Sequence, residues 1–230
     1  LASRMGWDCI DYSDQGLVDI PEEVYWFRQE KKSKDEESKN LSTVLLFDLS
    51  HNRLESMPSN SFWFRADKLQ VVALDYNQFV ELSSGVSDCR DILSFTASQN
   101  RLEGPTVLGE KTPLNALHDL ISLDLSGNCI QDWPENGLKN IATLEVLKLG
   151  NNQLEVIPGP ECLSTLINLK HLDISTNHIH ALGSDNGIGS LTCLQTLNLS
   201  GNVLESLPED LGHIGATLLS LNLSNNNLRW

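Results

Sequence analysis

The 230-residue chain is poor in cations, with 16 Lys and Arg against 31 Asp and Glu and a formal net charge of −15. Proteins that bind a nucleic-acid backbone need Lys and Arg to displace counterions, and docking on an anionic membrane surface needs the same charges. The sequence also lacks any run of 18 apolar residues, so it contains no candidate membrane-spanning helix. We therefore expect no nucleic-acid partner and no membrane insertion.

Cysteines are few and widely scattered. They show no C-x-x-C pair and no Cys/His finger spacing, and their number is odd. This usage indicates reduced thiols and predicts an intracellular, cytoplasmic location. The five are Cys9, Cys89, Cys129, Cys162 and Cys193.

The sequence motifs of catalysis are missing as well. The chain has no G-x-x-x-x-G-K-[ST] phosphate loop, no G-x-S-x-G elbow and no H-E-x-x-H zinc motif. His171, His178 and His180 lie close together in sequence, but a zinc site needs three or four converging ligands. Surface histidines are the simpler interpretation. We predict that this chain is not an enzyme and has no catalytic residues, no cofactor and no metal.

Leucine and asparagine are in excess, with 40 and 20 residues. A set of asparagines recurs at intervals of 23 to 28 residues, and each has apolar residues eight, five and three positions before it and two after it. One clear unit contains Leu144, Leu147, Leu149, Asn152 and Leu154. A period of this length is the signature of a repeat protein. The recurring asparagines are Asn52, Asn77, Asn100, Asn128, Asn152, Asn177, Asn202 and Asn226.

This pattern resembles the signature of the leucine-rich repeat superfamily, L-x-x-L-x-L-x-x-N-x-L, over nearly the whole chain. Mixed repeat endings such as Leu207-Pro208-Glu209-Asp210-Leu211 are similar to those of the typical intracellular subclass. The resemblance implies an α/β fold, a right-handed solenoid with parallel strands on its concave face and helices, turns and loops on its convex face. It also implies a structural asparagine ladder, in which each recurring Asn bonds turn backbone within its own coil and towards the next.

We expect three regions along the chain. Residues 1–27 form a degenerate N-terminal capping repeat, in which Gln15 takes the place of the asparagine. Residues 28–40 are a mixed-charge insertion, interpreted as a solvated helix or loop, or else as a docking or phosphorylation segment. Residues 41–230 hold eight repeats, which we expect to be truncated before a C-terminal cap because no polar capping segment follows the last repeating asparagine. A second irregular stretch, residues 103–119, predicts a protruding loop.

Outward-facing residues of the short strands are expected to form columns on the concave surface. By sequence position these columns hold eight acids, including Asp8 and Asp14, against two bases, Lys148 and Lys170. This imbalance predicts a groove that binds another protein with a basic or mixed surface. The alternative is that L-D-L-S is simply a common strand sequence in the family. The residues predicted to contact the partner are Asp11, Asp48, Asp75, Tyr76, Asp124, Glu145, Lys148, His171, Asp173 and Asn198.

The aromatic pairs Trp26-Phe27 and Trp63-Phe64 are a second candidate surface. Packing within the stack is the simpler interpretation, whereas an exposed pair would mark a partner site.

Three functions follow from the resemblance. The first is a protein-protein interaction module of a larger intracellular signalling or scaffold protein, which binds mainly through its concave face. The second is an extracellular receptor or secreted domain that recognises a ligand, favoured by the L-P-x-x-x-F-x-x-L-like ending at residues 57–69. The third is the regulatory repeat region of an enzyme, such as a kinase, GTPase, phosphatase or ubiquitin ligase, whose catalytic domain lies outside this chain.

Overall fold

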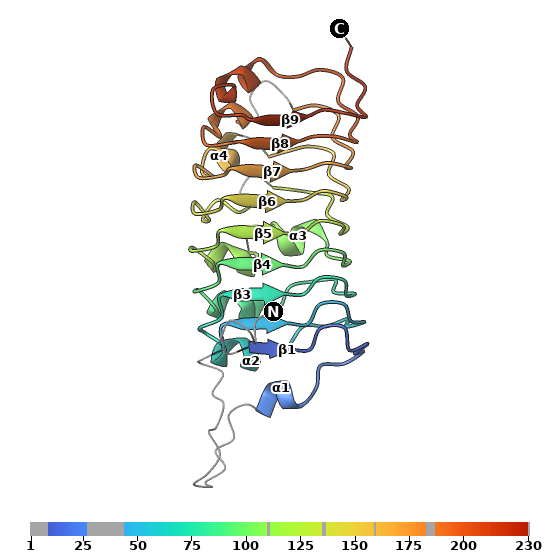
Figure 1. Ribbon diagram of the computed structural model, residues 1–230, viewed down its shortest axis with the longest axis vertical. Helices are drawn as coiled ribbons and strands as arrows, with labels where there is room; N and C mark the ends of the chain where they lie inside the picture. The colour runs from blue at the N-terminus through green and yellow to red at the C-terminus, as the bar shows by residue number, and fades with distance from the viewer. Residues whose placement is uncertain are drawn as a thin grey trace.

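Nine short parallel strands stack in sequence order into a single open sheet (Figure 1). The computed structural model describes residues 9–26, 44–109, 111–134, 137–158, 160–182 and 187–229. Asp8 and the predicted insertion at residues 28–40 lie outside these ranges. The strands are β1 (Cys9–Asp11), β2 (Leu46–Asp48), β3 (Val71–Ala73), β4 (Ser94–Thr96), β5 (Ser122–Asp124), β6 (Val146–Lys148), β7 (His171–Asp173), β8 (Thr196–Asn198) and β9 (Ser220–Asn222).

Each strand turns its middle residue into the core and its two outer residues towards the open face. The alternation follows from the two-residue period of a β-strand, and it selects an apolar residue at the middle position. The exception is Leu221 of β9, which stays 38% exposed, beside Leu219, which is 81% exposed. The buried middle residues are Ile10, Phe47, Val72, Phe95, Leu123, Leu147, Leu172 and Leu197.

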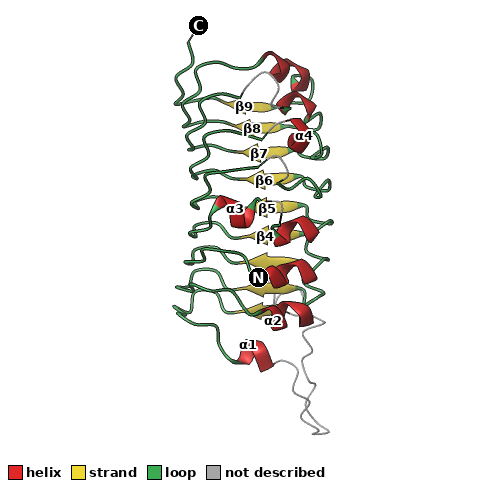
Figure 2. Cartoon of the chain, turned by 180° about the vertical axis from the view of Figure 1, so that it is seen from behind, coloured by secondary structure: helices red, strands yellow, loops and turns green. Residues whose placement is uncertain are grey.

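Short helices return the chain from one strand to the next and lie mainly along one side of the strands (Figure 2). None exceeds six residues, so each is held by packing rather than by its own length. The helices are α1 (Glu23–Trp26), α2 (Asn60–Arg65), η3 (Ser84–Asp88), α3 (Gly104–Val107), η4 (Pro113–Ala116), α4 (Pro160–Leu163), η5 (Ile188–Ser190) and η6 (Glu209–Ile214).

Helix α2 contains the second aromatic pair, Trp63 and Phe64, and buries only the first of the two. Trp63 is fully buried, 5.9 Å from Phe47 between ring centroids, and its indole N–H donates to the carbonyl of Pro58 at 3.0 Å. Phe64 is 72% exposed, so the packing interpretation is correct for the first residue of this pair and wrong for the second. The Trp26 side chain and Phe27 lie outside the described residues.

Residues 103–119 are not the protruding loop that the sequence suggested. Within this stretch α3 and η4, together with the residue that follows each helix, bury Val107, Leu108, Leu114 and Leu117 completely. Gly104 lies so close to the next repeat that a Cβ there would stand 2.6 Å from the carbonyl oxygen of Asp132. The apolar residues were present in the sequence, but their irregular spacing concealed that they pack into the stack.

A left-handed residue lies three positions after each strand, at the same point in every coil. This conformation favours Gly and Asn, and other residues adopt it at a cost. It reverses the chain out of the strand and so turns the following residue inwards. That residue is the repeating asparagine in eight of the nine coils, and seven of these asparagines are buried while Asn226 in the last coil is partly buried. The nine left-handed residues are Asp14, His51, Tyr76, Gln99, Gly127, Asn151, Thr176, Gly201 and Asn225.

The amide of each of these eight asparagines joins two coils. The Asn152 side-chain oxygen accepts from the backbone N–H of Ile130 at 3.1 Å, and its NH2 group donates to the carbonyls of Leu125 and Leu149, both at 3.0 Å. Ile130 and Leu125 belong to the preceding coil. The bonds between coils therefore run backwards along the chain, whereas we had expected them to run towards the next coil. Gln15 does not make them: its side chain is exposed and donates to Ser13 in its own turn. The other asparagines repeat the Asn152 pattern.

Candidate functional site: the concave face of the sheet

The strand register places the last residue of every strand in one column on the open face of the sheet. Six of the ten predicted contact residues lie in this column. His171 occupies the first position of β7, Glu145 directly precedes β6, and Asp75 and Tyr76 follow β3 in its turn. The column runs Asp11, Asp48, Ala73, Thr96, Asp124, Lys148, Asp173, Asn198 and Asn222.

Several acids of this column have a structural role in the turn that follows the strand. One side-chain oxygen of Asp173 accepts from the backbone N–H of Ser175 at 2.9 Å and from its hydroxyl at 2.6 Å. Asp48 accepts the same two bonds from Ser50. At Asp11 the corresponding bonds from the Ser13 hydroxyl and N–H lower the pKa of the carboxyl below its usual value, against an opposing effect of burial. The alternative interpretation of the L-D-L-S strands is therefore partly correct.

The C-terminal half of the face neutralises most of its own charge, although Asp173 has no cationic partner among the described residues. Lys148 pairs with Asp124 in the neighbouring strand at 3.2 Å, and Lys170 pairs with Glu145 at 2.8 Å. These are the two cations that the sequence places on this face, and both are engaged. The second oxygen of Asp173 accepts from the amide of Asn198 at 3.2 Å. His171 hydrogen-bonds the Thr196 hydroxyl at 2.7 Å.

The N-terminal half has a different character. Asp14, Asp48 and Asp75 form no ion pair with any Lys, Arg or His that the structure describes. Beside them Tyr76 is 52% exposed, and its ring stacks on that of His51 with centroids 4.4 Å apart and planes 13° apart. His51 was not predicted from the sequence. It directly precedes a repeating asparagine, and only the structure shows that this position is a turn at the surface.

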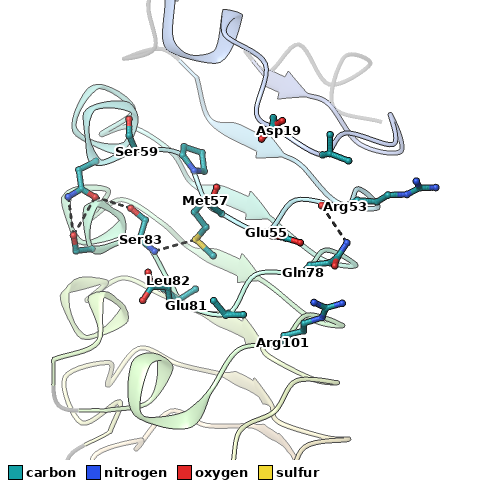
Figure 3. Close-up of a pocket in the computed structure, with 16 residues that line it drawn as sticks. Asp19, Arg53, Glu55, Met57, Ser59, Gln78, Glu81, Leu82, Ser83 and Arg101 are labelled. Atoms are coloured by element: carbon teal, nitrogen blue, oxygen red, sulfur yellow. Dashed lines mark hydrogen bonds between the residues drawn. The ribbon is translucent and has the colours of Figure 1, made fainter.

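A separate groove opens on another side of the first four coils (Figure 3). It has a volume of about 1170 Å³, with Arg53, Gln78 and Arg101 along one rim and Met57 and Leu82 deeper inside. No residue predicted from the sequence to bind a partner lines it. Its lining carries acids as well as arginines, namely Asp19, Glu55 and Glu81, so it has no clear preference for the charge of a ligand.

Among the described residues, no group of three or more His, Cys, Asp or Glu side chains converges as a metal site would require. None of the described helices is both long enough and apolar enough to cross a membrane. Stacked parallel strands with a buried asparagine at the turns of seven successive coils define an open solenoid, a class of protein built from repeats.

Comparison with known proteins identifies the family of repeats. A family model for the leucine rich repeat matches residues 142–204. The leucine-rich repeat-containing G-protein coupled receptor 5 of Rattus norvegicus is 30% identical over 121 residues, 52% of this chain and 12% of that protein. The probable inactive serine/threonine-protein kinase roco10 of Dictyostelium discoideum is 30% identical over 141 residues, 59% of this chain and 5% of that protein. The chain thus spans only a small part of these relatives.

Solved structures agree on the fold. A leucine-rich repeat protein of Leptospira interrogans superposes with a TM-score of 0.76 at 24% identity, over 97% of this chain and 56% of that one. A TLR13–ssRNA13 complex superposes with a TM-score of 0.72 at 24% identity, over 82% of this chain and 26% of that one. The chain belongs to the leucine-rich repeat superfamily. Domains of this superfamily are generally protein-interaction modules, and nothing in the described residues shows catalysis.

Proposed function

We propose that the chain is the protein-interaction module of a larger intracellular signalling or scaffold protein, and that it binds a partner protein with a basic surface mainly through its concave face. One observation carries the proposal: a column of side chains, polar in every strand except β3 with its Ala73, runs through all nine strands in register, and its N-terminal acids have no cationic partner within the described chain. Complementary charge on a partner would speed encounter and fix orientation. The absence of a nucleic-acid partner remains a prediction, because one structural neighbour is a complex with RNA.

Photo-crosslinking tests which face binds. Benzoylphenylalanine would replace Thr96, Lys148 or His171, one at a time, on the concave face. Phe64 in α2 is the matched control, since it is an exposed aromatic residue outside the sheet. In extract of the source cells we expect the same partner adduct from the three concave positions and none from position 64. Adducts from position 64 alone would contradict the proposal.

The intracellular location is part of the proposal and rests on the thiols. All five cysteines are free, and burial protects Cys89 and Cys162. When the protein is isolated from its source, denatured without reductant and alkylated, five thiols should therefore be modified. Fewer modified thiols, or attached glycans, would support a different function.

That second candidate is an extracellular receptor or secreted domain that recognises a ligand. It is favoured by the receptor among the relatives. The regulatory region of an enzyme is favoured in the same way by the kinase-like relative and by the adenylate cyclase of Schizosaccharomyces pombe, 28% identical over 151 residues. Catalysis by residues 1–230 alone would contradict all three proposals.

A further inference from the structure

The stacked, exposed rings of Tyr76 and His51, called the aromatic step below, lie at the N-terminal part of the concave face. Tyr76 and His51 hold left-handed turn positions in adjacent coils, with φ of 54° and 57°. Their backbones are tied together, since the His51 N–H donates to the carbonyl of Asp75 at 2.8 Å. One face of the Tyr76 ring is covered by His51, yet half of the residue remains exposed. The rings are therefore rigidly placed and accessible.

Gln99 holds the corresponding left-handed turn position in the fourth coil, and it leaves the rings of Tyr76 and His51 uncovered. Gln99 directs its amide over Gly127 in the following coil, where a Cβ would stand 2.2 Å from the amide nitrogen. The side chain of Gln99 therefore lies over Gly127 and not against Tyr76. In the same direction from Tyr76, the carboxylate of Asp75 reaches the fourth coil, where it accepts from the Ser98 N–H at 2.7 Å and from the Thr96 hydroxyl at 2.5 Å.

Carboxylate oxygens beside the step keep unused acceptor capacity. A carboxylate offers about four lone-pair sites. The bonds to Asp75 use one site on each oxygen, and both bonds to Asp48 fall on the same oxygen, Oδ1. No described cation neutralises either group, in contrast to Asp124 and Glu145 further along the face. The charge of the face is thus concentrated where its exposed aromatic rings lie.

We infer that the concave face recognises an arginine side chain of its partner, which stacks on Tyr76 and hydrogen-bonds the carboxylates of Asp75 and Asp48. The inference rests on the proposed function and adds to it the chemical group that is recognised. A guanidinium is planar and always charged, stacks on aromatic faces and presents several N–H donors to carboxylates. A lysine ammonium supplies the charge without the planar fork, and an apolar side chain would leave the carboxylates desolvated without a partner.

Three small probes test the inference on the full chain. They are N-acetyl-Gly-Arg-Gly-amide and its lysine and citrulline analogues. Binding is followed by NMR through the ring signals of Tyr76 and, in every variant, through the backbone amide signals of Ser98 and Ser50, which donate to Asp75 and Asp48. Citrulline keeps the planar shape and removes the charge. We expect the arginine probe to bind most tightly, the lysine probe more weakly, and the citrulline probe to leave the signals unchanged. Equal binding of all three probes would overturn the inference.

Variants separate this site from general attraction to an acidic protein. Tyr76→Leu should weaken the arginine probe by roughly two- to fivefold, as expected for a lost cation–π contact at an exposed site. Tyr76→Phe, which keeps the ring, should retain binding, and Asp75→Asn should weaken it. The control Phe64→Leu, at an aromatic residue that is even more exposed than Tyr76 and lies outside the sheet, should change nothing. If Tyr76→Leu binds the arginine probe as tightly as the parent protein and the folded Tyr76→Phe variant do, the site is refuted.

The two proposals fail in different ways. If the arginine probe does not select Tyr76 but crosslinks still come from Thr96, Lys148 and His171, the arginine site is wrong and the concave interface stands. If the probe selects Tyr76 while partner crosslinks come only from position 64, the concave interface is wrong.

Discussion

Replacing one buried asparagine tests how the coils are joined. In Asn152→Leu the side chain keeps the same branched arrangement of heavy atoms, becomes larger and loses every hydrogen bond. Asn152 is only 6% exposed, so water cannot readily replace those bonds. The two carbonyl acceptors each keep another donor, because Leu125 also accepts from Asn128 at 2.9 Å and Leu149 also accepts from Asn177 at 3.0 Å.

The backbone N–H of Ile130 is the group that loses its acceptor, since the Asn152 side-chain oxygen is the partner recorded for it. A buried donor without a partner costs about 1–3 kcal/mol. The free energy of unfolding should fall by that amount. Because Ile130 lies in the preceding coil, the damage should appear there, more than 20 residues before the substitution.

Urea denaturation measures the loss, and amide hydrogen exchange locates it. The Ile130 amide should exchange faster in Asn152→Leu than in the parent protein. The control is Asn226→Leu in the last coil, where Asn226 accepts from the Leu204 amide but is itself only partly buried, so water can take the place of the lost acceptor. Equal losses for the two variants, or an Ile130 amide that stays protected, would refute the reasoning.

Four further changes have definite expected outcomes. Thr176 is β-branched with φ of 52°, so Thr176→Gly should raise the free energy of unfolding by roughly 1 kcal/mol in urea denaturation, and a loss would contradict the strain argument. Conversely, Gly127→Ala at φ of 67° should lower it by about 1 kcal/mol or more; an unchanged midpoint would be unexpected. Burial, assisted by nearby acids, raises the pKa of Cys89 to about 12. An unfolded thiol ionises near pH 8.5, so this stabilisation is complete below about pH 8.5 and is lost as the pH rises towards 12. Cys89→Ala should therefore show a smaller loss of stability between pH 8 and pH 11 than the parent, and parallel curves would exclude the effect. Lys148→Met breaks an ion pair whose lysine is 51% exposed, so stability should change by less than about 1 kcal/mol at low or high salt.

The period of the asparagines was enough to predict the fold. Apolar residues at fixed offsets from Asn152 specify the middle of β6, the two flanking core positions and the residue after the turn, so strand register follows directly from the sequence. Irregular segments resisted this treatment. The packed helices α3 and η4 have no repeat to align with, and only tertiary contact shows that Leu108 and Leu114 belong to the core.

The candidate surface was predictable by position and not by interaction. Counting outward positions placed Asp48, Lys148 and Asp173 in one column, as the register requires. The count could not show that Lys148 is already paired, because side-chain reach across strands depends on rotamers and on the neighbour's residue type. It also gave equal weight to each acid, whereas the structure pairs Asp124 and Glu145 with lysines and gives Asp48 and Asp75 no cation among the described residues.

Comparison within the column separates what the fold requires from what a partner could require. Asn198 accepts from the N–H and hydroxyl of Ser200, as Asp48 does from Ser50, so the turn is served equally by a neutral and a charged side chain. Ala73 at the same position of β3 shows that even this bond is dispensable. The turn therefore does not explain why β1, β2, β5 and β7 carry aspartate while β8 and β9 carry asparagine. Negative charge at these positions is extra to the needs of folding, and like charges in neighbouring strands oppose stability. A surface that keeps such charge unpaired at β1 and β2, beside an exposed aromatic step, has the properties of one that meets a cationic partner.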